Sequence, residues 1–140
     1  MTASFKGTYE RTYADMYDEF LKALDVNFLP WKAASASTPE LNVSEEAGVW
    51  IIKTSTTLKS IELKFKLGEE FEKTTPDGRE VKAIVTMEDN KFVSIQTAKK
   101  DDQKSTKVIR EFNGNEVVQT MTFIGSDPEI ICVQKFKRTS

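Results

Sequence analysis

The chain has 140 residues, with 20 basic and 22 acidic side chains and a net charge of −2. We therefore expect one domain over residues 1–140 and no nucleic-acid partner, which would need a basic face. The sequence has no histidine, so the usual general base and the commonest metal ligand are both missing. The single cysteine, Cys132, cannot form an intrachain disulfide and favours a reducing compartment. These features predict a cytoplasmic protein that is not an enzyme and carries no metal or cofactor.

The N-terminal part of the chain combines one strand with two helices. A strand is expected at Phe5–Tyr13, and Asp15 follows it at a position that could cap a helix. The first helix is predicted from apolar residues spaced i, i+3, i+4 and i+7, which are Tyr17, Phe20, Leu21 and Leu24. A second, shorter helix is expected at about Phe28–Ser37, and Pro39 would bar its continuation.

Everything after Pro39 has the pattern of short strands and turns. Ile61–Leu67 alternates apolar and charged residues, which is the period of a strand with one solvated face. Turn sequences such as Asn113-Gly114 separate the segments. Further strands are expected at Val49–Thr54, Val81–Met87, Phe92–Thr97, Lys107–Phe112, Val117–Phe123 and Ile130–Phe136.

The spacing of these segments predicts a mainly β fold. Nine or ten short strands joined by hairpin-length loops favour an antiparallel meander that closes as a barrel or clam. The two early helices would form a lid over such a barrel. A β-sandwich with an added helix is the alternative that the composition leaves open.

Arg110 is the first candidate for binding chemistry. It lies in a strand whose two faces are equally mixed in polarity, so the alternation does not decide which way it points. An inward guanidinium would sit in a low-dielectric space and would need an anion or a set of acceptors. A carboxylate matches its fork geometry. The alternative is a surface arginine paired across the sheet with Glu111 or Glu116.

Gln134 is the second candidate, because it shares an otherwise apolar strand face with Cys132 and Phe136. A buried amide needs hydrogen-bond partners. Gln134 is therefore either a ligand contact or a core glutamine satisfied by a neighbouring side chain. Cys132 lies among aliphatic residues and is expected to be a small core side chain rather than a nucleophile. We expect no catalytic residue and no metal ligand.

Several segments resemble the intracellular lipid-binding proteins, specifically the fatty-acid-binding protein family. The resemblance covers essentially the whole chain, from Phe5-Lys6-Gly7-Thr8-Tyr9 to residues 132–136. Its most specific parts are FKLGEEF at residues 65–71 and IRE at residues 109–111. The resemblance implies a monomer with a ten-stranded antiparallel up-and-down β-barrel, or β-clam. A helix-turn-helix lid between the first and second strands would cover a water-filled cavity.

The resemblance also implies a ligand and the residues that hold it. Arg110 would point into the cavity and meet the carboxylate of a long-chain fatty acid, directly or through water. Lys22, Lys32 and Lys59 would place positive charge around the portal and permit transient contact of the lid with anionic membranes. The positions that the resemblance assigns to the portal, the upper cavity and the path of the ligand chain are Tyr17, Leu21, Val26, Ala34, Pro39, Leu41, Thr54, Leu58, Pro76, Asp77, Gln119 and Met121. For the apolar members, ordinary packing is the alternative.

The last strand departs from the pattern of many fatty-acid binders. Where those have Arg-x-Tyr, this chain has Gln134 and Phe136, an ending that resembles the cellular retinol-binding proteins. Those proteins, however, typically have glutamine at the position of Arg110 and lysine at that of Leu41. We expect Gln134 to assist Arg110, with a looser or more water-mediated head-group site because Phe136 cannot donate a hydrogen bond. A retinoid or another neutral amphiphile is the alternative ligand, and a ligand-free protein-interaction module is a further alternative.

Overall fold

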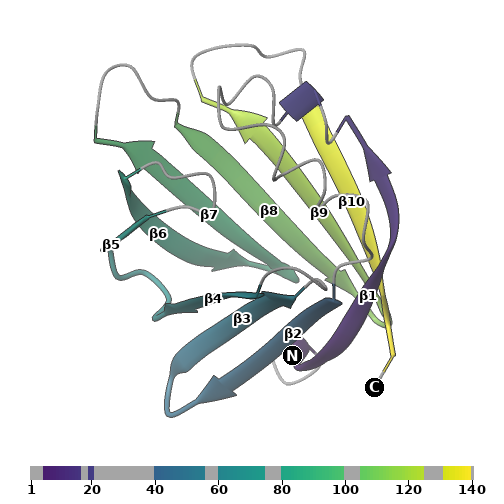
Figure 1. The fold of residues 1–140 in the computed structure, drawn as a ribbon. Coiled ribbons are helices and arrows are strands. Elements are labelled where there is room, and N and C mark those ends of the chain that lie inside the picture. Colours follow the sequence, from purple (N-terminus) through teal and green to yellow (C-terminus); the bar gives the residue numbers. More distant parts are fainter. Residues whose placement is uncertain are drawn as a thin grey trace.

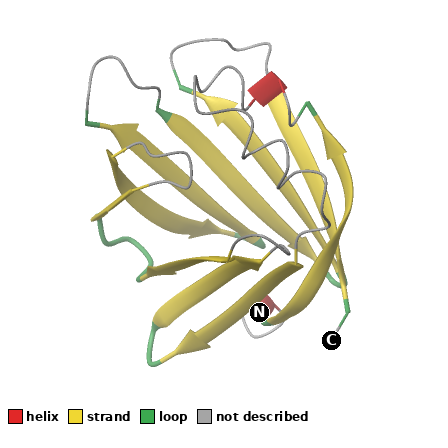
Figure 2. Ribbon diagram, viewed as in Figure 1, coloured by secondary structure: helices red, strands yellow, loops and turns green. Residues whose placement is uncertain are grey.

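The computed structural model describes residues 5–16, 19–20, 40–55, 60–74, 80–99, 105–124 and 131–139. Ten β-strands make up most of this part of the chain, and one antiparallel sheet contains all of them (Figures 1 and 2). In chain order the strands are β1 (Gly7–Asp15), β2 (Glu40–Glu46), β3 (Val49–Ser55), β4 (Ser60–Phe65), β5 (Phe71–Thr74), β6 (Glu80–Glu88), β7 (Lys91–Ala98), β8 (Thr106–Asn113), β9 (Glu116–Phe123) and β10 (Ile131–Arg138).

The sheet curls into a nearly closed barrel. Its strand order is β4-β3-β2-β1-β10-β9-β8-β7-β6-β5, so the first and last strands of the chain are paired and β4 and β5 form the two edges. The amide of Thr139 donates to the carbonyl of Thr8 over 2.7 Å, which ties the C-terminal end to β1. The amide of Gly68, in the turn between the two edge strands, donates to the carbonyl of Val85 in β6 over 2.8 Å. The ten-stranded up-and-down barrel expected from the resemblance is confirmed.

Sequence patterns mark residue ranges for eight of the nine or ten expected strands, and each of these eight is present with its ends within two residues of the expected ones. The two strands that the sequence patterns do not mark are β2, which ends in Glu45 and Glu46, and β5, which has four residues. Of the expected helices, the described residues include Glu19 and Phe20, where the amide of Phe20 donates to the carbonyl of Met16 over 2.9 Å. The rest of both expected helices, and so the lid, lies outside the described residues.

An aromatic cluster fills one end of the barrel. Phe92 lies at its centre, with its ring 5.0–5.6 Å from four other rings and roughly perpendicular to them, the edge-to-face arrangement that aromatic side chains prefer. These four rings belong to Phe5, Trp50, Phe65 and Phe112. Phe5 also stacks on Phe112 with ring centroids 4.2 Å apart. This end of the barrel is therefore a packed core.

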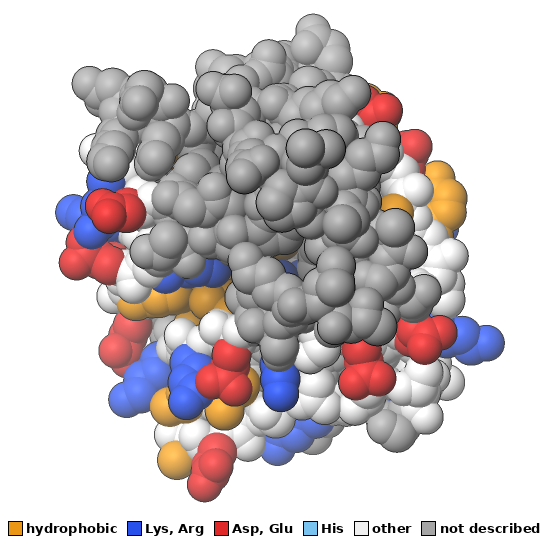
Figure 3. Space-filling model, in the orientation of Figure 1, with side chains coloured by type: hydrophobic (Ala, Val, Ile, Leu, Met, Phe, Trp, Pro, Cys, Tyr) orange, Lys and Arg blue, Asp and Glu red, His pale blue; other side chains and the backbone are white. Residues whose placement is uncertain are grey.

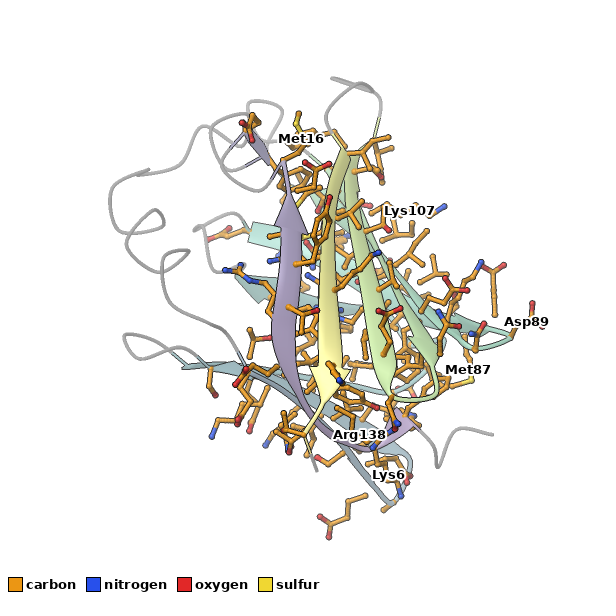
Figure 4. The ribbon with its side chains drawn as sticks, turned by 90° about the vertical axis from the view of Figure 1, so that its right-hand side faces the viewer. Lys6, Met16, Met87, Asp89, Lys107 and Arg138 are labelled. Carbon is orange, nitrogen blue, oxygen red and sulfur yellow. The ribbon has the colours of Figure 1, made fainter. Side chains whose placement is uncertain are left out.

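The opposite end is built differently. Figure 4 shows Met16 near this end, and Lys6 and Arg138 at the end with the aromatic cluster. Phe20 stacks on Phe123 of β9 with ring centroids 4.5 Å apart, which joins the described helical turn to the barrel wall. Away from the aromatic rings, inner-face side chains such as Thr54 and Met121 are only half-buried. The interior is therefore less densely filled away from the aromatic cluster.

The described part of the outer surface carries both kinds of charge, in keeping with 20 basic and 22 acidic side chains in the chain. Figure 3 shows acidic and basic side chains intermingled on the described part of the visible face. Along β10, charged side chains occupy outer-face positions that alternate with buried ones, as Lys135 and Lys137 do on either side of Phe136. The distinctive electrostatics of this molecule lie on the inner face of the sheet.

Candidate ligand-binding site

Arg110 lies on the inner face of the barrel. In the β7–β8 and β8–β9 pairings it stands opposite Phe92 and Gln119, which are 1% and 8% exposed. Directly opposed residues of antiparallel strands share a face of the sheet. Arg110 therefore shares the face of the aromatic cluster, whereas its neighbour Glu111 lies on the other face. The alternative in which Arg110 pairs with Glu111 or Glu116 is wrong.

A continuous row of polar side chains crosses three strands from Arg110. Arg110 stands opposite Gln119 of β9, and Gln119 stands opposite Gln134 of β10. Arg110 Nε donates to Gln119 Oε1 over 2.9 Å, and Gln119 Nε2 donates to Gln134 Oε1 over 2.8 Å. The same Nε2 has Met121 Sδ at 3.8 Å. The register of the sheet thus brings together Arg110 and Gln134, the two candidates singled out from the sequence, with Gln119 and Met121, which the resemblance assigns to the path of the ligand.

The charge of Arg110 has no acidic partner among the described residues. Burial lowers the pKa of its guanidinium to about 10, because the charged form loses water. Its Nε bonds to Gln119, and its two terminal nitrogens, with four N–H groups, have no acceptor in the described part of the chain. The side chain still keeps some accessible surface. Arg110 lies on the inner face and its charge is strongly desolvated. We therefore infer that its remaining accessible surface faces the interior of the barrel.

Further polar side chains line the neighbouring strands. Thr106, 1% exposed, donates from Oγ1 to Gln96 Oε1 over 3.0 Å, and Ser94 is 2% exposed in the same wall. These residues face inward from β7 and β8 beside Val108. The inner face is therefore divided into an aromatic end and a polar band on β7–β10. Such a band is not typical of an aliphatic core, because buried polar groups cost free energy unless they form hydrogen bonds.

The remaining expected site residues that the structure describes fall into two groups. Leu41 and Phe136 are 0% and 1% exposed and belong to the core cluster, which is the packing alternative considered for such residues. Thr54 is half-buried, opposite Leu41 on β3, and Met121 is half-buried beside Gln119 on β9. The expected residues outside the described part of the chain are Tyr17, Leu21, Val26, Ala34, Pro39, Leu58, Pro76 and Asp77.

Sequence reasoning did not find that Gln119 is the direct partner of Arg110. The signal was present in the alternation of β9, where Gln119 lies between inward-facing Val117 and Met121. An amide in that position needs polar neighbours on the adjacent strands. Arg110 becomes this neighbour through the register of the β8–β9 hairpin, which depends on the turn at residues 113–115. A shift of that register by one residue would place Arg110 and Gln119 on opposite faces of the sheet.

The structure offers no nucleophile or metal centre within the described residues. Cys132 is 0% exposed, and burial raises the pKa of its thiol to about 12, which keeps it protonated and unreactive at neutral pH. No group of three or more acidic or cysteine side chains is placed to bind a metal ion in the described ranges. None of the described residues belongs to a helix with the length and apolar character needed to span a membrane.

Comparisons with known proteins agree with this architecture. Residues 6–137 match the lipocalin / cytosolic fatty-acid binding protein family. A fatty acid-binding protein of Tyrophagus putrescentiae is 41% identical over 133 residues, covering 94% of this chain and 95% of its own. Cellular retinoic acid-binding protein 1 of Takifugu rubripes is 38% identical over 138 residues, or 96% and 98% of the two chains. The chain belongs to the lipocalin / cytosolic fatty-acid binding protein family.

A solved structure extends this similarity to three dimensions. The Schistosoma mansoni fatty acid binding protein in complex with arachidonic acid superposes with a TM-score of 0.86 at 26% sequence identity. The match covers 99% of this chain and 98% of the other. The whole barrel, rather than a local motif, is therefore shared with a solved member of the family.

Proposed function

We propose that this protein is a carrier of long-chain fatty acids, whose carboxylate is held by Arg110 with help from Gln134 and water. The observation that carries the proposal is the desolvated guanidinium of Arg110, which has no acidic partner among the described residues. A buried cation of this kind is costly until an anion neutralises it. One carboxylate balances one guanidinium and can accept two parallel hydrogen bonds from it.

The hydrocarbon tail supplies most of the binding free energy in this proposal. Burying a methylene group contributes about 0.8 kcal/mol, so a tail of about 14 methylenes gives an upper bound near 11 kcal/mol before ordering costs. A micromolar dissociation constant needs about 8 kcal/mol. Arg110 therefore orients the ligand and selects the head group. The half-buried side chains of Thr54 and Leu63 are described candidates for contact with the tail.

We propose a role as carrier rather than as enzyme, in keeping with the family to which the chain belongs. Among the described residues, the polar band offers donors and acceptors but no base beside a nucleophile, and the thiol of Cys132 is protonated and buried. Binding and release of a lipid need no more than this. We further propose that the protein is a cytoplasmic monomer, in keeping with its one reduced cysteine and the family to which it belongs.

The second candidate ligand is a retinoid. Gln134 and Phe136 favour it, because a neutral amide and a phenyl ring stand where many fatty-acid binders have a second cation and a phenol. A relative of similar identity is named for retinoic acid, which is also a carboxylate. Arg110 would suit that acid as well as a fatty acid, and would suit retinol poorly, since an alcohol leaves the guanidinium without a counter-charge.

Displacement of a fluorescent probe from delipidated protein tests the proposal. Oleate, oleyl alcohol, retinoic acid and retinol are titrated side by side. We expect both acids to bind more tightly than the corresponding alcohols, with oleate at micromolar affinity or better. A preference for retinol or oleyl alcohol would overturn the assignment of Arg110. Failure of all four lipids to bind would favour the ligand-free interaction module instead.

A further inference from the structure

Arg11 is a second arginine on the inner face of the barrel. It stands opposite Phe136, which is 1% exposed, in the pairing of β1 with β10. It lies two residues after Tyr9, which is 0% exposed in the same cluster. Both relations place the Cβ of Arg11 on the inner face. The sequence alone conceals this placement, because the register shifts at Thr12 and puts Tyr13 on the outside, 49% exposed.

The positive charge of Arg11 reaches into the same interior as the polar row. Cys132, Gln134 and Phe136 are alternate residues on the inner face of β10. Arg11 stands opposite Phe136, yet its charge also acts on the buried thiol of Cys132, where it partly opposes the rise in pKa that burial and, to a smaller degree, the carboxylates of Asp15 and Glu19 cause. Of the charged groups that act on this thiol, Arg11 has the largest effect. Gln134 lies between Cys132 and Phe136 on the same face of β10, so it belongs to the stretch of wall that Arg11 reaches.

Gln134 presents hydrogen-bond donors in the space between the two arginines. Arg110 can only donate, so Gln119 must offer it the amide oxygen and turn its NH₂ group towards Gln134. Gln134 in turn accepts through Oε1, which leaves its Nε2 donors without an acceptor in the described part of the chain, although the residue is 4% exposed. Its partner across β1 is Ala14, a small and exposed side chain. No bulky residue of β1 therefore occupies that end of the row.

We infer that Arg11 is a second specificity-determining cation of the binding site, so that the site extends from β8 to β1 and selects acidic amphiphiles over neutral ones. This inference rests on the proposed function and adds a residue and a span to it. Arg11 would supply the second positive charge that Gln134 does not. Because Arg11 also interacts elsewhere in the protein, its charge, rather than a free donor, carries the argument. In a low-dielectric interior, a charge acts over several ångströms.

The experiment measures dissociation constants of oleate and oleyl alcohol for the wild type, Arg11→Met, Arg11→Lys and Arg110→Gln. Lys137→Met is the matched control, because Lys137 is an exposed outer-face cation on β10. We expect Arg11→Met to weaken oleate by about 5- to 10-fold, the size of one charge interaction across a partly hydrated interior. Oleyl alcohol should change by less than about 2-fold, since it has no charge to lose. Arg11→Lys should retain the preference for oleate, and Lys137→Met should behave as the wild type.

The outcomes separate this inference from the proposed function. If Arg110→Gln removes the preference for oleate while Arg11→Met keeps it, the role of Arg11 is wrong and the carrier function stands. Equal losses of oleate and oleyl alcohol in Arg11→Met would show that Arg11 acts through packing, which also overturns the inference. A wild type that shows no preference for oleate over oleyl alcohol would overturn the proposed function itself.

Discussion

Arg110 and Gln119 are joined by a hydrogen bond of 2.9 Å from the guanidinium Nε to the amide oxygen. Because arginine has no acceptor, this bond fixes the orientation of the Gln119 amide and, through it, that of Gln134. Among the described residues, the pair also leaves a positive charge with neutral hydrogen-bond partners in a place from which burial has removed much of the water. This combination of fixed dipoles and an unbalanced charge is what an acidic ligand would complete.

Replacing Gln119 by glutamate should supply an internal counter-ion. In Gln119→Glu the new carboxylate would neutralise Arg110 from the side of its Nε, so a ligand carboxylate would no longer be needed to balance the charge, and Gln134 could rotate its amide to donate to the new carboxylate. We expect oleate affinity to fall by at least about 10-fold and the free energy of unfolding to rise or stay unchanged. Fluorescence displacement and urea unfolding measure these two quantities. Gln96→Glu, which adds an acid to the same inner face away from Arg110, is the control and should retain most of the oleate binding.

Removing the buried charge should stabilise the ligand-free protein. In Arg110→Gln the cost of desolvating a guanidinium disappears, and the new amide can still donate to Gln119. We expect the free energy of unfolding without ligand to rise by about 1–2 kcal/mol, measured by urea denaturation after delipidation. Oleate at the same concentration should stabilise the wild type more than the variant, because a ligand that binds only the folded state adds stability that grows with the logarithm of its affinity. A less stable Arg110→Gln would mean that Arg110 holds the barrel together.

Tyr9 is expected to be a structural residue that closes the packed end of the barrel. Its hydroxyl donates to the carbonyl of Phe5 over 2.9 Å and accepts from Arg138 Nη2 over 2.8 Å, while the guanidinium carbon lies 4.8 Å from the ring centroid. Tyr9→Phe leaves both polar partners without the hydroxyl, and should lower the free energy of unfolding by about 1–3 kcal/mol. Tyr13→Phe, on the exposed outer side of the same strand, should change it by less than about 0.5 kcal/mol. Oleate affinity should be unaffected by either change.

The ionisation of Cys132 should make the protein less stable at alkaline pH. Burial raises the thiol pKa from about 9 to about 12, so the folded state keeps a proton that the unfolded state loses. This contribution to stability is complete below pH 9 and is lost as the pH rises towards 12, by about 1.4 kcal/mol per pH unit. Urea unfolding of the wild type and Cys132→Ala from pH 8 to 10.5 gives the difference in slope. Identical slopes would contradict the burial of the thiol, as would rapid labelling of the native protein by a disulfide reagent at pH 8.

The sequence predicts the barrel well, because its strand signals are local. Alternation and turn residues mark eight strands directly, and Asn113-Gly114 and its equivalents mark the hairpins. β5 is not predicted because four residues are too few to show a period. β2 is not predicted because the charged Glu45 stands at a position that the alternation assigns to the inner face, opposite Trp50. At this end of the barrel the carboxylate of Glu45 is exposed, accepts from the amide of Gly48 over 2.8 Å and pairs with Lys6.

The binding site is less predictable, because it depends on register between strands. Single-strand patterns left the direction of Arg110 open, and the resemblance alone turned it inward. That Gln119 bonds to it, and that Arg11 shares the interior, follow from pairings over long sequence separations and from a bulge at Thr12. A bulge reverses the faces of every later residue in its strand and has no reliable sequence signal.

The most direct measurement is a pH titration of oleate labelled with ¹³C at its carboxyl carbon, bound to the protein and followed by NMR. If the carboxylate meets the guanidinium of Arg110, its pKa in the complex should be depressed below that of a carboxyl group in water, because the adjacent positive charge favours the ionised form. The depression should disappear in Arg110→Gln, where burial without the cation should raise the pKa instead. A bound carboxyl group that titrates as in water in both proteins would contradict the placement of the head group beside Arg110.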